Sequence, residues 1–244
     1  MKYLGLAIQF LTVLPVQIRG TVTDNDLGRS MACFPLVGLV MGGVLAAAAW
    51  LMRGLPADLG AFVLLLSMTL LTGALHLDGV ADSVDGLYGV RDTERRLQIM
   101  RDSCVGAMGA VGLVFVVLLK WILLKALWPA AVGPALLAAL TFSRWVQAAA
   151  ASASPYARSN GKAGAYMAHA PRPVVLGLVV PVAAPFFVLF GPAGLCLFAL
   201  VVVAILLLRG FVMRRIGGLT GDTLGLLNEA AEVLVLMGVL LCLS

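Results

Sequence analysis

The sequence predicts an all-α integral membrane protein, a bundle of about seven transmembrane helices with an N-terminal helix at the membrane interface. Of its 244 residues, 61% are hydrophobic and only 12% are charged, whereas soluble domains carry roughly 25% charged residues. Apolar runs of bilayer-crossing length, about 20 residues, follow one another along the chain. No stretch of soluble composition interrupts them, so residues 1–244 are predicted to form a single transmembrane domain.

The predicted spans follow the apolar runs. They lie near residues 34–52, 60–77, 107–128, 132–153, 173–190, 192–208 and 223–243. The letters FGPAG at 190–194 predict a tight turn between the fifth and sixth spans. The Gly-x-x-x-Gly spacing at 38–42 predicts close helix packing inside the chain, with dimerisation as the alternative. Residues 3–18 are expected to lie along the interface; if they span instead, the helix count becomes eight.

The basic residues indicate the orientation of the bundle. Most of the 17 Lys and Arg residues fall in the amino-terminal segment and in the loops that share its side of the membrane. Because cytoplasmic loops carry the excess of Lys and Arg, this side is predicted to face the cytoplasm of a bacterium, inside its inner membrane. Topology thus accounts for the net charge of +5, and no nucleic-acid partner is predicted. Lys120 is expected to extend its side chain outward to the opposite interface.

The acidic residues gather in two stretches, 78–102 and 222–232, with few elsewhere. Asp78, Asp82 and Asp85 are spaced i, i+4, i+7, which places three carboxylates on one face of a helix. Like charges that close repel one another unless a cation neutralises them, and a set of oxygen ligands suits Mg²⁺, or Mn²⁺, better than Zn²⁺. We therefore predict a metal site on these residues, with a solvated acidic loop as the alternative.

The second acidic stretch enters the last predicted span. Asp222 and Glu229 share a helical face at i, i+7, and Asn228 lies to its side. An ionisable residue inside a span is a functional candidate, although an internal ion pair with Arg144 or Arg214 is the alternative. We predict that Glu229 is catalytic and that Asp222 and Asn228 bind substrate. Both stretches are expected to meet around one polar cavity on the cytoplasmic side.

Basic side chains near the first acidic stretch and in the loop after residue 153 are candidates for binding phosphate. The planar guanidinium of arginine binds phosphate oxygens in bidentate fashion, whereas attraction to lipid head groups is the alternative reading. We predict that Arg101, Arg158 and Lys162 bind substrate. Asp102, at the mouth of the third span, is predicted to be a catalytic carboxylate.

The chain resembles the cobalamin synthases, the adenosylcobinamide-GDP ribazoletransferases, through most of its length. The motifs that carry the resemblance are QFLTVLPV at 9–16, FPLVGLVMG at 34–42, GALHLDGVADSVDGL at 73–87, MRDSCVGAMGAVG at 100–112, SRW at 143–145 and GLTGDTLGLLNEAAE at 218–232. The DSVDG at 82–86 is also similar to the first half of the signature of the CDP-alcohol phosphotransferases, but the second half departs from it.

The resemblance implies transfer of cobinamide phosphate from adenosylcobinamide-GDP to a ribose hydroxyl of α-ribazole or its 5′-phosphate, with release of GMP and with Mg²⁺ as cofactor. In such a mechanism Asp82 and Asp85 are catalytic as well as metal ligands. A CDP-alcohol phosphotransferase of lipid synthesis and an ion-coupled transporter are the alternatives. Membrane lipid is the expected surrounding, and a homo-oligomer is left open.

Overall fold

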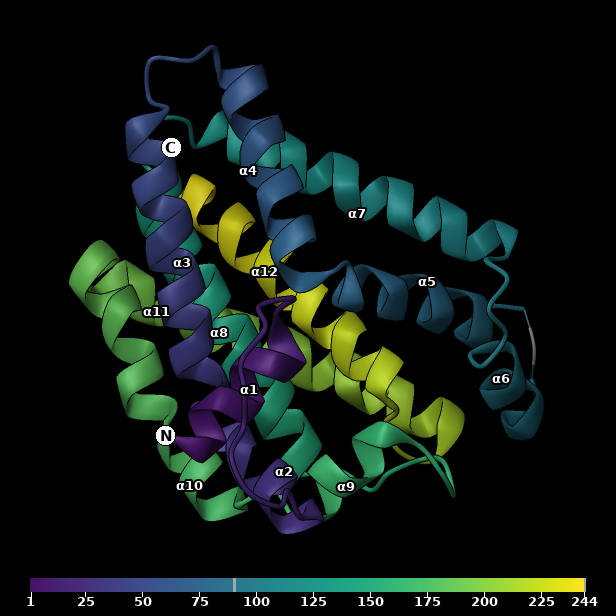
Figure 1. Cartoon of the computed structure of the whole chain (residues 1–244). Helices are drawn as coiled ribbons and strands as arrows, with labels where there is room; N and C mark the ends of the chain where they lie inside the picture. Colours follow the sequence, from purple (N-terminus) through teal and green to yellow (C-terminus); the bar gives the residue numbers. More distant parts are fainter. Residues whose placement is uncertain (90, 244) are drawn as a thin grey trace.

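The computed structural model describes residues 1–89 and 91–243, apart from the side chain of Lys162, and every regular element in this part of the chain is a helix (Figure 1). The first elements are α1 (Lys2–Leu11), α2 (Asp24–Ser30), η1 (Met31–Cys33), α3 (Phe34–Leu51), α4 (Ala57–Thr72), α5 (Leu75–Leu87) and α6 (Thr93–Ile99). The remaining elements are α7 (Ala107–Ala126), α8 (Val132–Ser152), α9 (Lys162–Ala168), α10 (Arg172–Gly177), α11 (Val179–Ile216) and α12 (Gly221–Leu243). This architecture confirms the predicted all-α membrane fold.

The alanine-rich helix α8 forms the centre of the bundle, and almost all of its residues are buried. It packs against α3, α11 and α12. Close approach of α3 depends on two glycines: a β-carbon at Gly38 would lie 2.2 Å from the carbonyl oxygen of Leu140, and one at Gly42 would lie 2.9 Å from Cα of Leu137. The Gly-x-x-x-Gly spacing therefore serves packing inside the chain, as predicted, because small residues let two helix backbones come together in lipid.

The second predicted span is shorter than the sequence suggested. Gly73 and Ala74 both have left-handed backbone angles, with φ of 58° and 57°, and they end α4 before residue 77. The following helix α5 runs at 86° to α4 and away from α3 (Figure 1). Its 13 residues extend about 20 Å, less than the roughly 30 Å of a bilayer core, so α5 does not itself cross the membrane.

The predicted turn at 190–194 is present inside α11. Gly191 has φ of 61° and ψ of −149°, and it breaks the helix into two arms. Rings of Phe186 and Phe198 lie on opposite sides of the break with centroids 5.3 Å apart, whereas 12 residues of continuous helix would separate them by about 18 Å. Phe142 of α8 contacts both rings, so the two arms pack against the central helix.

The number of apolar helices is lower than the seven predicted spans. By length and composition, four stretches of the described residues could cross a membrane: Asp24–Leu51, Ala107–Ala126, Arg172–Ile216 and Gly221–Leu243. The bent pair α4 and α5 becomes a fifth if it is counted as one span. Two physical features explain the difference. The break at Gly191 divides the third stretch into two arms, and α8 is less apolar because other helices, rather than lipid, surround it.

The N-terminal helix α1 is too short to span, since its 10 residues extend about 15 Å. It packs against α2 and α3. Phe10 stacks on Phe34 with ring centroids 5.5 Å apart, and Lys2 forms an ion pair with Asp26 at 2.7 Å. These contacts fit the predicted interfacial helix and give no support to an eighth span.

The packing of α3 on α8 predicts unequal effects of two glycine substitutions. Gly38→Ala should lower the stability of the detergent-solubilised protein by about 1–3 kcal/mol, because the added methyl collides with a backbone oxygen. Gly43→Ala is the matched control, since nothing lies within 4 Å of a β-carbon there. Thermal unfolding followed by circular dichroism should give a lower melting temperature for the first variant only. Equal melting temperatures would contradict the packing.

Candidate active site

Helix α5 presents the first acidic cluster, and its helical register is the one predicted. Asp78 is exposed, while Asp82 and Asp85 are half-buried. His76 points to the other side and is buried in the bundle. Three carboxylates thus lie along one side of a helix that begins at the sharp bend after α4.

The first turn of α12 lies directly against α5. A β-carbon at Gly79 would lie only 2.6 Å from the carbonyl oxygen of Asp222, so glycine permits this contact. Gly225 packs in the same way against the backbone of His76. The structure therefore brings Asp222 next to Asp78 and Asp82, although about 140 residues separate them in the sequence.

Negative charge exceeds positive charge in this cluster. Burial, together with the negative charges of Asp222 and Asp78, raises the pKa of the Asp82 carboxyl to about 7, and the nearby Arg158 only partly opposes this effect. Desolvation and nearby negative charges both disfavour the ionised form of a carboxyl. The site would therefore favour an additional cation.

Arg158 contacts this cluster and is held in a defined position. Arg158 Nη2 donates to the carboxylate of Asp222 at 2.6 Å and to the carbonyl oxygen of Met100 at 3.2 Å. The hydroxyl of Thr220 also donates to Asp222 at 3.2 Å. The guanidinium thus links α12, the loop after α8 and the end of α6, beside the acids.

The other predicted residues on this side have different surroundings. Asp85 accepts hydrogen bonds from the backbone N–H groups of Gly106 and Gly109, at 2.7 and 2.8 Å. Arg101 and Asp102 are exposed in the loop between α6 and α7, where Asp102 accepts from the backbone N–H of Cys104 at 3.0 Å.

Lys162 begins α9, but its side chain lies outside the described part of the structure. Its predicted contact with substrate therefore stays a prediction.

The donor set determines what kind of metal site is feasible. Within residues 1–89 and 91–243, no three His, Cys, Asp or Glu side chains are placed to hold a metal ion by themselves. Asp222 faces Arg158, and Asp85 faces backbone N–H groups, which leaves Asp78 and Asp82. Mg²⁺ usually takes one or two carboxylates and completes its shell with water and substrate phosphates. Asp78 and Asp82 therefore fit an open metal site, in which water or a bound ligand completes the shell, better than a site closed by protein ligands alone.

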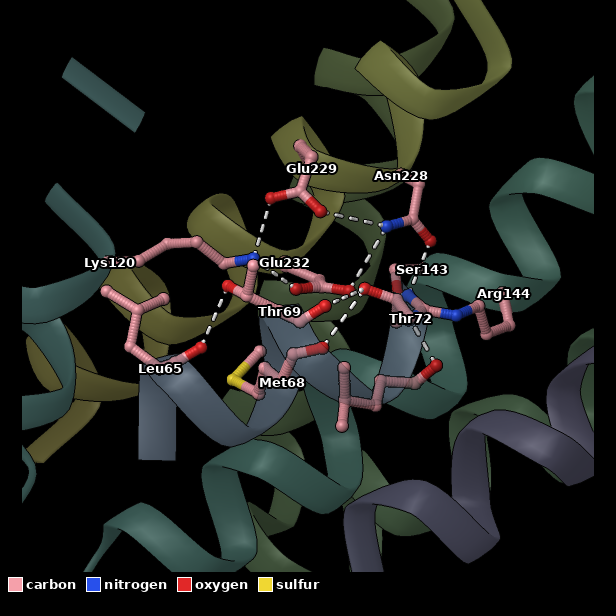
Figure 2. A network of polar contacts seen from close by, with 11 residues as sticks. Leu65, Met68, Thr69, Thr72, Lys120, Ser143, Arg144, Asn228, Glu229 and Glu232 are labelled. Atoms are coloured by element: carbon pink, nitrogen blue, oxygen red, sulfur yellow. Dashed lines mark hydrogen bonds and ion pairs between the residues drawn. The ribbon is translucent and has the colours of Figure 1, made fainter. Parts of the chain in front are cut away.

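A second polar cluster lies inside the bundle, between α7, α8 and α12 (Figure 2). We call it the buried charge network: Lys120, Ser143, Arg144, Asn228, Glu229 and Glu232. Lys120 Nζ lies 2.6 Å from a carboxylate oxygen of Glu229 and 2.6 Å from one of Glu232. Arg144 forms an ion pair with the other oxygen of Glu232 and donates to Asn228 Oδ1 at 2.6 Å. Two cations thus balance two carboxylates.

The network shows that the predicted direction of Lys120 is wrong, and it places Glu229 and Asn228 away from the other acids. We predicted that Lys120 extends outward to the interface, and this is wrong. Its side chain points inward to two glutamates (Figure 2). Glu229 and Asn228 do not join the Asp82 cluster, because their side chains are buried and hydrogen-bonded within the network. One cavity lined by Glu229 is about 10 Å³, room for roughly one water molecule, and another, lined mainly by apolar side chains of α7 and α12, is about 400 Å³. Their predicted catalytic and substrate-binding roles stay predictions.

The sequence contained a signal for this network that hydrophobic patterns alone do not show. Two basic residues, Lys120 and Arg144, lie within apolar helices, and so do two acids, Glu229 and Glu232. Because a charge in a span needs a partner, equal numbers of intramembrane acids and bases favour internal pairing. The alternative of an internal ion pair with Arg144 is the one present here, and its partner is Glu232.

A family model and similar known proteins point to the same family. The model of the cobalamin-5-phosphate synthase family matches residues 3–240. An adenosylcobinamide-GDP ribazoletransferase of Pseudomonas putida (strain GB-1) is 43% identical over 237 residues, and that of Pseudomonas entomophila (strain L48) is 40% identical, each match covering 97% of both chains. The protein of the same name from Desulforamulus reducens is 38% identical over 240 residues, covering 98% of this chain and 96% of its own. No solved structure matches the chain.

The buried charge network predicts strong coupling between Lys120 and Glu229. Lys120→Met alone should destabilise the protein by about 3–5 kcal/mol, because it leaves a buried carboxylate unpaired. Adding Glu229→Gln removes that charge and should restore most of the stability, since the pair of Arg144 and Glu232 remains. Thermal unfolding in detergent measures both effects.

The same double variant tests the catalytic role of Glu229. If the only role of Glu229 is to neutralise the charge of Lys120, the stable double variant should keep transferase activity within about tenfold of the wild type. A double variant that regains stability but has no turnover would support the catalytic role instead.

Proposed function

The chain belongs to the cobalamin-5-phosphate synthase family, and we propose that it transfers cobinamide phosphate from adenosylcobinamide-GDP to α-ribazole or α-ribazole 5′-phosphate, releasing GMP. The observation that carries this proposal is the cluster in which Asp82 lies beside Asp78, Asp222 and Arg158. Acids that attract a divalent cation, next to a fixed guanidinium, form a suitable environment for a diphosphate.

The proposed reaction is an in-line phosphoryl transfer. The ribose hydroxyl oxygen of the acceptor forms a bond to the phosphorus attached to cobinamide, and the bond from that phosphorus to the bridging oxygen of the diphosphate breaks. GMP leaves with the electron pair of this bond. Negative charge spreads over the phosphoryl oxygens in the transition state, so positioning and electrostatic stabilisation provide most of the catalysis.

Arginines are proposed to bind the phosphate groups. Arg158 is oriented by Asp222 and by the Met100 carbonyl, so its fork can bind without a large loss of side-chain entropy. Arg101 stands in the adjacent loop, one residue after Met100. Lys162 is the third proposed cation, on α9.

We propose Mg²⁺, with Mn²⁺ as a substitute, as the cofactor. Asp78 and Asp82 would hold the ion, and Asp222 and Asp85 lie near enough to influence the charge on Asp82. A bound divalent ion supplies charge neutralisation for the diphosphate oxygens. Burial and the negative charges of Asp222 and Asp78 raise the pKa of Asp82, and a bound cation would stabilise its ionised form, which supports this proposal.

The attacking hydroxyl must lose its proton to a base within hydrogen-bond reach. Asp102 is the proposed base, since it is exposed in the loop beside the cluster, whereas the carboxylate of Asp82 would hold the ion. Glu229 is a weaker choice, because its carboxylate already bonds to Lys120 within the bundle.

We propose that the protein resides in the bacterial inner membrane with this cluster facing the cytoplasm, where its nucleotide-linked substrate would be found. The excess of basic residues on the same side supports this orientation. Single cysteines at Arg95 and Arg214, in a variant without its four natural cysteines, should react with a membrane-impermeant maleimide only after the membrane is opened. Labelling from outside intact cells would contradict this orientation.

An assay in lipid tests the function directly. Purified protein in nanodiscs, given adenosylcobinamide-GDP, α-ribazole 5′-phosphate and Mg²⁺, should release GMP, and EDTA should abolish the release. Chromatography with mass detection should find GMP and adenosylcobalamin 5′-phosphate in equal amounts. No GMP in this assay, together with turnover of a CDP-alcohol, would overturn the proposal.

The acid cluster makes a sharper prediction. Asp82→Asn should lower kcat by about 100-fold or more, because the amide keeps an oxygen but loses the negative charge. Asp58→Asn is the matched control, since Asp58 forms an exposed ion pair with Lys125 away from α5. Activity of the Asp82 variant near that of the control would exclude a central role for this carboxylate.

A further inference from the structure

We infer that Asp85 is a positioning residue, which caps the amino end of α7 from the neighbouring helix α5 and thereby holds the loop 101–105 in place. This inference rests on the proposed function for its effect on turnover, while the cap itself stands on geometry alone. It gives Asp85 a task different from that of Asp82, one helical turn earlier.

The amino end of α7 lacks a capping side chain of its own, because its N-cap residue is Gly106. The first N–H groups of any helix have no partner within the helix. Asp85 Oδ2 accepts from the N–H of Gly106 at 2.7 Å, and Oδ1 accepts from the N–H of Gly109 at 2.8 Å. These are the N-cap and N3 positions, the same two donors that a capping box satisfies with two local side chains. One carboxylate from another helix satisfies both.

The glycines of α7 are required for this contact. A β-carbon at Gly106 would lie 2.5 Å from Asp85 Oδ1, and one at Gly109 would lie 2.2 Å from Oδ2 and 2.8 Å from the carbonyl oxygen of Ala81. Any larger residue at either position would push the carboxylate away. The sequence GAMG at 106–109 therefore binds the carboxylate of Asp85, because its two glycines donate hydrogen bonds and leave room for the side chain.

The cap fixes one end of the loop that carries Arg101 and Asp102. Gly106 is held by Asp85, and at the other end the carbonyl oxygen of Met100 accepts from Arg158. Arg158 is itself paired with Asp222. Five exposed residues thus span two anchored points, and both anchors belong to the acid cluster.

Charge also favours this arrangement. The amino end of a helix carries a partial positive charge, and a carboxylate there is stabilised. Both oxygens of Asp85 are engaged by N–H donors, whereas Asp82 is surrounded by other acids. Asp85 therefore acts on the reaction through the loop, and Asp82 acts on it directly.

Two variants disrupt the same contact from opposite sides. Asp85→Asn replaces one carboxylate oxygen, which accepts a hydrogen bond, by an amide nitrogen that cannot accept one from the backbone N–H. Gly109→Ala leaves all the acidic residues in place, but its methyl group displaces the carboxylate of Asp85. Hydrogen exchange of the full-length protein in nanodiscs should show roughly tenfold or faster exchange at residues 106–109 in both variants. Asp82→Asn and Gly43→Ala are the controls, and both should leave this exchange unchanged.

Kinetics of the same four proteins complete the test. Both disrupting variants should lose about 100-fold in kcat through misplacement of the loop. Their Mg²⁺ concentration for half-maximal rate should stay within about twofold of wild type. In Asp82→Asn that concentration should rise. The double variant Asp85→Asn/Gly109→Ala should be little worse than either single one, because both remove one interaction.

Several results would overturn the inference. Unchanged exchange at residues 106–109 in Asp85→Asn, with a raised Mg²⁺ requirement like that of Asp82→Asn, would make Asp85 a metal ligand. Faster exchange with unchanged kcat would reduce the cap to a structural contact. If the wild type released no GMP, the proposed function would fail, and the exchange data would still decide whether Asp85 caps α7. If Asp85→Asn does not fold, Gly109→Ala and Gly106→Ala provide the same measurements.

Discussion

The arrangement of α7, α8 and α12 depends on four buried charges. Each charge finds its opposite charge only when these three helices pack together. Lys120 comes from α7, Arg144 from α8, and Glu229 and Glu232 from α12. A charge within a helix that faces lipid or protein costs several kcal/mol unless a partner meets it, so these helices must pack with their charged faces inward. The pairing fixes how α12 is rotated about its axis. Its first turn, with Asp222, consequently faces α5.

Close contacts between backbones then bring the site together. Gly79 lets α5 approach Asp222, and Gly109 lets the start of α7 approach Asp85. In lipid the hydrophobic effect does not drive helices together, and tight van der Waals packing through small residues replaces it. The same principle joins α3 to α8 at Gly38. The glycines of this chain thus determine which side chains can meet, besides allowing the turns at Gly73 and Gly191.

Two acidic groups that look similar in the sequence have opposite electrostatic balance in the structure. Around Glu229 and Glu232, each negative charge has a positive partner, which suits a permanent structural element. Around Asp82, the carboxylates of Asp78, Asp85 and Asp222 outnumber the guanidinium of Arg158, which leaves a deficit of positive charge. A site that binds a cation with an anionic substrate needs such a deficit, since full internal pairing would leave nothing for the ligand to neutralise. The imbalance therefore separates the candidate active site from the buried charge network.

The sequence by itself determined the helical fold, the register of Asp78, Asp82 and Asp85 on α5, and the turn at Gly191. These features depend on local properties: the length of apolar runs, the period of the helix, and the conformational freedom of glycine. The resemblance of its motifs to cobalamin synthases also identified the family correctly.

Only the tertiary structure decided the partners of those side chains. Helical periodicity shows that Asp222 and Glu229 lie near one face of α12, but not that the first meets Arg158 and the second meets Lys120. The 86° bend after Thr72 was also hidden, because Ala74 adopts a left-handed conformation that few residues other than glycine favour. Contacts between residues about 20 to 140 positions apart depend on how whole helices pack, and the period of a single helix contains no information about its neighbour.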